Sequence, residues 1–184
     1  MNKALIIVDV QRDFCEGGSL AVDGGTRVAT RLNSLLDSAG HWWEHVVATQ
    51  DRHIDPGDHF SDTPDYVDSW PVHCVAGTDG AEFHPALKTD KIEAVFRKGA
   101  YAAAYSGFEG DADGVALVDW LRERGVTEVD VVGIATDYCV RATALDAVRL
   151  GFTTNVLLEV VAGVAAQSTD QALSELREAG VNLI

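Results

Sequence analysis

The sequence predicts an α/β protein: a single-domain, doubly wound and mostly parallel six-stranded sheet with helices on both faces. Short runs of Leu, Ile and Val recur along the chain, and amphipathic helical patterns separate them. Strands that alternate with helices are typical of a parallel sheet covered on both faces. The 184 residues, 47% of them hydrophobic, suit one globular domain with a sizeable core. Because no repeat or linker divides the chain, we expect one domain over residues 1–184.

The predicted elements alternate in chain order. Six apolar runs are the predicted strands: residues 3–10, 46–49, 92–96, 129–135, 153–160 and a short last one at 181–184. Four helical patterns lie between them: residues 26–38, 115–124, 140–150 and 169–178. The last three helices each end near a glycine (Gly125, Gly151 and Gly180), a residue that commonly terminates helices.

One region fits neither pattern. Residues 51–91 are irregular and rich in His, Pro and Asp. Loops of this length inside a compact domain are usually functional. We therefore expect this region to be a loop that carries a binding site.

One carboxylate and three of the six histidines gather in this loop: Asp51, His53, His59 and His73. Asp51 and His53 are two residues apart, so in extended backbone both side chains leave on the same face. Pro56-Gly57 breaks regular structure and lets the chain fold back, which brings His59 toward the same point. This set of ligands predicts a site for one divalent transition metal ion, with zinc, iron and manganese all compatible.

A second set of reactive residues lies where predicted strands end. Asp9 ends the first strand, Lys98 follows the third, and Cys139 stands where the fourth strand becomes a helix. In an open parallel sheet these ends form one edge, where ligands bind. Thr136 or Asp137 could cap this helix, which would place the Cys139 thiol at the positive helix end. This position and a nearby Lys98 ammonium are expected to lower the pKa of the thiol. Asp9 could accept the thiol proton and return it to a leaving group.

The remaining candidates are expected to be structural. Cys15 and Cys74 lack the strand-end setting of Cys139. His84 precedes Pro85 and shows no partner, and His41 and His45 flank an aromatic pair near a helix end. The Gly-Gly pairs after Glu16 and Asp23 match no phosphate-binding spacing and are expected to be tight turns. Three aromatic residues beyond the reactive positions could wall a flat substrate: Phe14, Trp70 and Tyr105.

Composition limits the partners of the protein. The net charge is −15 and no Lys or Arg cluster occurs, so nucleic acid and anionic membranes are not expected partners. Three cysteines, no signal peptide and no apolar stretch of membrane-spanning length predict a cytoplasmic protein with reduced thiols. The expected partner is a small-molecule substrate. The sequence does not distinguish a monomer from a homo-oligomer.

Taken together, the motifs resemble those of a known family. The segment from Ala4 to Gln11, followed by Asp13-Phe14, is similar to the opening of the isochorismatase-like cysteine hydrolases. Lys98-Gly99 and the segment from Gly133 to Val140 match two further signatures of that family. The loop ligands and the segment Ser69–Cys74 resemble its nicotinamidase/pyrazinamidase branch, and the likeness runs over essentially the whole chain.

The resemblance implies an isochorismatase-like hydrolase domain and a role for each candidate. It implies a catalytic triad of Asp9, Lys98 and Cys139, with the metal held by the four loop ligands. It also implies a cis peptide between Ile134 and Ala135, which would turn the Ala135 N–H toward an oxyanion beside the N–H of Cys139. The substrate pocket would be lined by six residues: Phe14, Leu20, Trp70, Tyr105, Ile134 and Tyr138. Tyr138 departs from close relatives, which carry His at this place.

The activity implied by the resemblance is hydrolysis of nicotinamide to nicotinate and ammonia, a reaction of NAD salvage, and also of pyrazinamide to pyrazinoate. The reaction would pass through a cysteine thioester, while the metal anchors the ring nitrogen of the substrate. Three other hypotheses remain open from the residues. One is a sibling amidase for carbamoyl or ureido substrates; another is a hydrolase whose metal activates water, with Cys139 a spectator. The third is a non-enzymatic metal- or redox-responsive binding protein with Cys139 as its sensor thiol.

Overall fold

The structure is a computed structural model that describes residues 2–184, so Met1, the first residue of the predicted domain, lies outside the described residues. Its strands are β1 (Lys3–Val8), β2 (His45–Asp51), β3 (Ala94–Lys98), β4 (Asp111–Ala112), β5 (Val115–Ala116), β6 (Glu128–Ile134), β7 (Thr153–Ala162) and β8 (Asn182–Leu183). Its α-helices are α1 (Gly25–Ala39), α2 (Leu117–Glu123), α3 (Arg141–Arg149) and α4 (Ala166–Glu178). A π-helical turn at Thr136–Val140 precedes α3, and short 3₁₀ turns lie in the loops.

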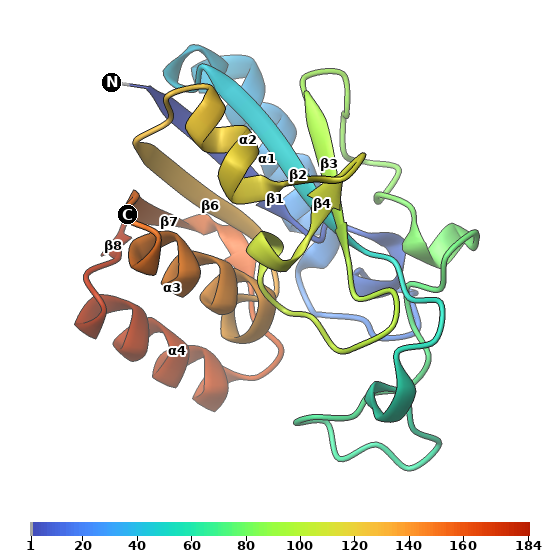
Figure 1. Ribbon diagram of the computed structural model, residues 1–184. Helices are drawn as coiled ribbons and strands as arrows, with labels where there is room; N and C mark the ends of the chain where they lie inside the picture. The colour runs from blue at the N-terminus through green and yellow to red at the C-terminus, as the bar shows by residue number, and fades with distance from the viewer. Residues whose placement is uncertain (1) are drawn as a thin grey trace.

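All eight strands form one sheet, in the order β5-β4-β3-β2-β1-β6-β7-β8. The six strands from β3 to β8 in this order are parallel, whereas β4 and β5 add an antiparallel edge. Figure 1 shows the twisted sheet with helices on both of its faces. The predicted α/β class with a mostly parallel sheet is confirmed.

The sheet is buried on both faces, and alternate side chains of its strand β1 pack into a separate hydrophobic core on each face. Leu5 and Ile7 of β1 pack in the cluster that contains the buried face of α1. Ala4 and Ile6 point the other way, into the cluster formed with α2, α3 and α4. The continuous apolar run that predicted β1 is therefore the signature of a strand between two helical layers.

The predicted number of six strands was wrong, because a small hairpin was overlooked. Asp113-Gly114 connects β4 to β5, and both residues have positive φ, at 52° and 83°. This is the backbone that an Asp-Gly pair favours in two-residue hairpin turns. Val115 and Ala116 pair in the sheet, so α2 begins at Leu117 rather than at residue 115 as predicted.

The fold brings its strand ends together at one edge. The chain runs from β1 through α1 to β2, and β6 lies on the other side of β1. The strand order thus reverses at β1, which opens a crevice at the carboxyl ends of the neighbouring strands. Among the helices of residues 2–184, none has both the length and the apolar character that a membrane crossing requires.

Candidate active site

The residues predicted at strand ends meet at the carboxyl edge of the sheet. Asp9 follows β1, and Asp51 and Lys98 end β2 and β3, where they are register partners. Cys139 lies in the π-helical turn that follows β6. Parallel pairing thereby assembles four groups that come from distant parts of the sequence.

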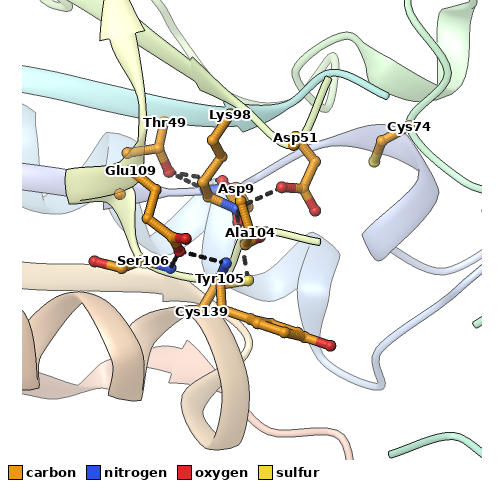
Figure 2. A network of polar contacts seen from close by, with 12 residues as sticks. Asp9, Thr49, Asp51, Cys74, Lys98, Ala104, Tyr105, Ser106, Glu109 and Cys139 are labelled. Atoms are coloured by element: carbon orange, nitrogen blue, oxygen red, sulfur yellow. Dashed lines mark hydrogen bonds and ion pairs between the residues drawn. The ribbon is translucent and has the colours of Figure 1, made fainter. Parts of the chain in front are cut away.

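Lys98 joins these groups into one buried network (Figure 2). Its Nζ donates hydrogen bonds to Asp9 Oδ2 at 2.8 Å and to Asp51 Oδ1, and it lies 3.8 Å from Cys139 Sγ. Burial lowers the pKa of the Lys98 ammonium, but the Asp51 and Asp9 carboxylates outweigh this effect and hold it well above its ordinary value. Lys98 is therefore a fixed positive charge between two carboxylates and a thiol.

Two donors hold the Asp9 carboxylate in place. Lys98 contacts one carboxylate oxygen, and the Thr49 hydroxyl donates to the other, Oδ1, at 2.6 Å. Complete burial raises the pKa of Asp9, and the nearby Lys98 charge partly opposes this rise. An Asp9 carboxylate oxygen lies within 4.8 Å of Cys139 Sγ, so the pair is close enough for a proton to pass with a small movement.

Thr49 is a site residue that the sequence reading missed. It lies two residues before Asp51 on β2, so both side chains point to the same side of the strand. Gln11 was missed as well: it accepts from the Asp51 N–H at 2.9 Å and donates to the Asp51 carbonyl at 2.8 Å. These two bonds fix the end of β2, and Gln11 is fully buried. Its place two residues after Asp9 was the available signal.

Two expectations about the surroundings of Cys139 were wrong: the side-chain cap of its helix and the lowered pKa of its thiol. Neither Thr136 nor Asp137 caps the turn with its side chain. Asp137 instead accepts hydrogen bonds from Val164 N–H at 2.9 Å and from the Ser168 hydroxyl at 2.6 Å, which ties the start of α4 to the site. Burial raises the pKa of the Cys139 thiol well above its ordinary value despite the opposing Lys98 charge, because desolvation disfavours a thiolate.

The four predicted metal ligands also come together. Ligand nitrogens of His53, His59 and His73 lie within 4.8 Å of one another, and all three side chains are buried. Asp51 Oδ2 lies 3.6 Å from His53 Nε2 and 4.0 Å from His73 Nε2. Desolvation, together with the neighbouring imidazoles, lowers the pKa of His59 to about 4, so this ring is neutral and able to bind a metal.

The hydrogen bonds of the imidazoles fit a metal ion. His53 Nδ1 lies 2.6 Å from the Gly99 carbonyl, and His73 Nδ1 lies 2.7 Å from the Pro71 carbonyl. These contacts make Nδ1 the protonated nitrogen and leave Nε2 as the free lone pair, an arrangement typical of metal-bound histidine. His53 Nε2 and His59 Nδ1 are buried without a hydrogen-bond partner in the described structure. A cation between these nitrogens and the Asp51 carboxylate would satisfy them.

A cavity of about 500 Å³, including its open mouth, joins the thiol to the imidazoles. Cys139, Asp51, His59 and His73 lie on its wall. All six residues predicted to line a pocket are there: Phe14, Leu20, Trp70, Tyr105, Ile134 and Tyr138. Ala21, Val22 and Val164 line it too, although the sequence reading did not single them out. The largely apolar walls, several of them aromatic, suit a small, flat organic molecule.

The backbone beside Cys139 has the expected form. The Ile134–Ala135 peptide is cis, as the resemblance implied, and Ala135 lies on the cavity wall with Cys139. The Ala135 carbonyl accepts from the Tyr138 and Val140 N–H groups at 3.1 and 3.0 Å, so the turn closes around Cys139.

The residues expected to be structural lie outside the cavity wall. Cys15 and Cys74 are buried free thiols. His45 pairs with Glu93 at 3.0 Å, and His84 accepts from the Ala86 N–H at 3.2 Å. His41 is exposed beside Trp42.

Comparisons with known proteins agree with this geometry. The family model described as the Isochorismatase domain matches residues 3–184. The chain is 64% identical over 183 residues to the nicotinamidase/pyrazinamidase of Mycobacterium tuberculosis, covering 99% of this chain and 98% of that protein. A pyrazinamidase of Pyrococcus horikoshii in complex with zinc has a TM-score of 0.84 at 38% identity, covering 100% and 99% of the two chains. The protein PnC1 from L. infantum in complex with nicotinate has a TM-score of 0.88 at 37% identity, covering 100% and 92%.

Proposed function

The chain belongs to the isochorismatase family, and from that premise we propose that it is a nicotinamidase that also hydrolyses pyrazinamide to pyrazinoate. The products from nicotinamide are nicotinate and ammonia. One observation supports this proposal most. Cys139, which contacts Lys98 of the buried network, lines the same small cavity as Asp51, His59 and His73 of the ligand cluster. Relatives of high identity with this activity, and neighbours solved with zinc and with nicotinate, agree with it.

The thiol forms and then loses a covalent bond to the acyl group. Asp9 takes the proton from Cys139 as Sγ attacks the carboxamide carbon. The tetrahedral intermediate collapses when Asp9 passes this proton to the departing nitrogen, which leaves as ammonia. Water then attacks the thioester while Asp9 removes its proton, the acid is released, and the thiol is restored. The raised pKa of Cys139 fits this cycle, because the proton leaves the thiol only as the new bond forms.

Lys98 and the backbone manage the charges of this cycle. The Lys98 ammonium stabilises the Asp9 carboxylate and the developing thiolate, both of which it contacts. The oxyanion of each tetrahedral intermediate is held by the N–H groups of Ala135 and Cys139 in the tight turn after β6. The aromatic and aliphatic residues on the cavity wall hold the flat ring and exclude water from it.

A divalent transition metal belongs to the same site in this proposal. Asp51, His53, His59 and His73 would hold it, since their free nitrogens and carboxylate suit zinc, iron or manganese. When bound, the ion supplies a Lewis-acidic anchor for the ring nitrogen of the substrate. Choice of the amide would thus depend on the ligand cluster, while cleavage would depend on the thiol.

The decisive experiment removes the thiol. Cys139→Ala should lower ammonia release from nicotinamide and from pyrazinamide by about 10³-fold or more, because covalent attack is lost. Cys15→Ala, which removes a buried thiol outside the cavity wall, is the matched control and should keep most of the activity. Release is measured at steady state on metal-analysed protein, with a panel of carbamoyl and ureido amides alongside.

The other hypotheses give different results in this assay. Substantial turnover by Cys139→Ala would contradict the covalent mechanism and favour water activated by the metal. A wild-type protein that cleaves a carbamoyl or ureido amide but neither pyridine nor pyrazine carboxamide would be a sibling amidase instead. Inertness toward every amide in the panel would favour a non-enzymatic binding protein.

A further inference from the structure

Residues 61–69, here named the flap, connect two residues of the cavity wall. His59 lies before the flap and Trp70 directly after it. Backbone hydrogen bonds close the base: the Ser61 N–H donates to the Trp70 carbonyl at 2.9 Å, and the Trp70 N–H donates to the His59 carbonyl at 2.8 Å. The position of the flap is therefore coupled to the position of Trp70.

The flap has its own internal order. Asp65 Oδ1 accepts hydrogen bonds from the N–H groups of Val67, Asp68 and Ser69, each at 2.9 Å. It also accepts from the Ser69 hydroxyl at 3.0 Å. The Tyr66 N–H donates to the Ser69 carbonyl at 3.1 Å. Because these bonds stay within the flap, its tip can move as one unit.

A single hydrogen bond ties this tip to the rest of the protein. Most of residues 62–68 are exposed. Apart from the bonds at the base, the only hydrogen bond or ion pair that joins the flap to another part of residues 2–184 comes from Tyr138. The Tyr138 hydroxyl donates to the Tyr66 carbonyl at 3.3 Å.

Tyr138 also contacts the cavity wall and lies next to the nucleophile. Its ring meets the Trp70 ring edge-on, with 5.0 Å between the ring centroids, and its centroid lies 6.2 Å from that of the Tyr105 ring. The Trp70 indole N–H in turn donates to the Tyr105 hydroxyl at 3.2 Å. A second cavity lies on the outer side of this wall, where Tyr105 and Tyr138 face Val67 and Asp68 of the flap. Tyr138 thus separates the inner cavity from a space that the flap borders.

We propose that Tyr138 is a positioning residue whose hydroxyl holds the flap, and with it Trp70, in the place that binds substrate. This inference rests on the proposed amidase function and gives the hydroxyl a role separate from that of the ring. The ring forms part of the wall, and the hydroxyl keeps that wall closed through the Tyr66 carbonyl. Loss of the hydroxyl weakens substrate binding and leaves the thiol chemistry intact, since the hydroxyl touches none of the reacting groups.

The test is Tyr138→Phe, which deletes the hydroxyl and keeps the ring. KM for nicotinamide should rise about two- to tenfold, the net value of one hydrogen bond, while kcat changes less than twofold. Hydrogen exchange of residues 60–70, measured by mass spectrometry without substrate, should accelerate by a similar factor, while α1 exchanges as before. Ser38→Ala is the control, because it deletes an exposed hydroxyl on α1, away from the flap and the cavity wall; its KM and its exchange over residues 60–70 should equal those of the wild type.

A second variant approaches the same contact from the flap side. Asp65→Ala removes the acceptor of the internal bonds, so the Tyr66 carbonyl is no longer held in place. It should also raise KM and leave kcat nearly unchanged. The double variant with Tyr138→Phe should raise KM by less than the product of the two single effects, because both act through one contact.

Several results would overturn the proposal. Unchanged KM and unchanged exchange in Tyr138→Phe would show that the hydroxyl holds nothing. Faster exchange with unchanged KM would separate the flap from substrate binding, and a loss of kcat alone would place Tyr138 in the chemical step. If the wild type hydrolyses neither amide, the proposed function fails, whereas the exchange comparison still decides whether the hydroxyl holds the flap.

Discussion

At the scale of single residues, Asp51 takes part in two systems of contacts at once. Its Oδ1 accepts from the Lys98 ammonium, and its Oδ2 faces His53 and His73. The Asp9–Lys98–Cys139 network and the imidazole cluster therefore share one carboxylate. A change to a ligand residue should affect turnover through this shared group as well as through the metal.

Within residues 2–184, His53 has no hydrogen-bond partner at its buried Nε2, so its loss should be felt first in metal binding. His53→Ala should reduce the bound metal to well below one ion per chain and lower nicotinamide turnover at least tenfold. The change removes a buried ring nitrogen that has no hydrogen-bond partner in the described structure and that would hold the metal in the proposed site. Metal content is measured by elemental analysis after purification and activity by ammonia release. His41→Ala, at an exposed histidine outside the cavity wall, is the control and should retain the wild-type metal content. Full activity in a metal-free His53→Ala protein would contradict a role for the cluster in substrate binding.

At the scale of elements, helix α1 begins without a side-chain cap of its own. Its N-cap is Gly24, at φ 88°, and no acidic residue lies in its first turn. Glu16, eight residues before Gly24, caps the helix instead. Its carboxylate accepts from Gly24 N–H at 2.7 Å, from Thr26 N–H at 2.8 Å and from the Thr26 hydroxyl at 2.6 Å. A carboxylate at the positive end of a helix satisfies its free N–H groups.

A pH-dependent loss of stability follows for Glu16→Gln. The Thr26 hydroxyl and N–H bonds lower the pKa of Glu16 in the folded protein from 4.5 to about 2. A carboxyl group whose pKa is lowered by folding contributes its full stabilisation at pH values above its pKa in the unfolded chain. This contribution is lost as the pH falls from 4.5 toward 2. At pH 7 the variant should lose about 0.5–1 kcal/mol of unfolding free energy, a small value because the group is exposed.

Urea unfolding at several pH values checks this prediction. The difference between wild type and Glu16→Gln should shrink as the pH drops through the window from 4.5 to 2. Glu159→Gln replaces an exposed carboxylate for which the described structure shows no side-chain partner, and it should change stability by less than about 0.5 kcal/mol. A difference for Glu16→Gln that stays constant with pH would show that its charge is not responsible.

At the scale of the whole molecule, the Lys98 network joins three strands that come from separate parts of the chain. Asp9 follows β1, Asp51 ends β2 and Lys98 ends β3. Both ion pairs of this network are buried, with side-chain exposure of 0 to 5%. Removing the cation would leave two carboxylates without a countercharge inside the protein.

Lys98→Met should therefore destabilise the metal-free protein strongly. The expected loss is about 3–5 kcal/mol of unfolding free energy, the usual cost of an uncompensated buried charge. Lys88→Met breaks an exposed pair with Asp37, whose side chains are 60% and 56% exposed, and should cost less than about 1 kcal/mol. Both variants are compared with the wild type by urea unfolding at pH 7. Equal losses in the two variants would show that burial of the Lys98 network is not what makes it important.

Much of the fold could be predicted because its signals are local. Apolar runs marked the six principal strands to within about two residues at most ends, and glycines marked the ends of helices. The β4–β5 hairpin was missed because two-residue strands carry no periodicity, although Asp113-Gly114 is a turn signal. Strand order was not predicted, since it depends on pairing between distant segments rather than on local pattern.

The reactive groups, and their place at strand ends or in one loop, could be read from the sequence without the fold. Asp9, Asp51, Lys98 and Cys139 lie together because parallel strands share a carboxyl edge, and the loop after β2 brings the three imidazoles to the same place. How these groups affect one another depends on tertiary packing. The raised pKa of the Cys139 thiol and the bond from Tyr138 to the flap depend on desolvation and on distances across the fold. These quantities arise when distant segments pack together, so no local pattern in the chain encodes them.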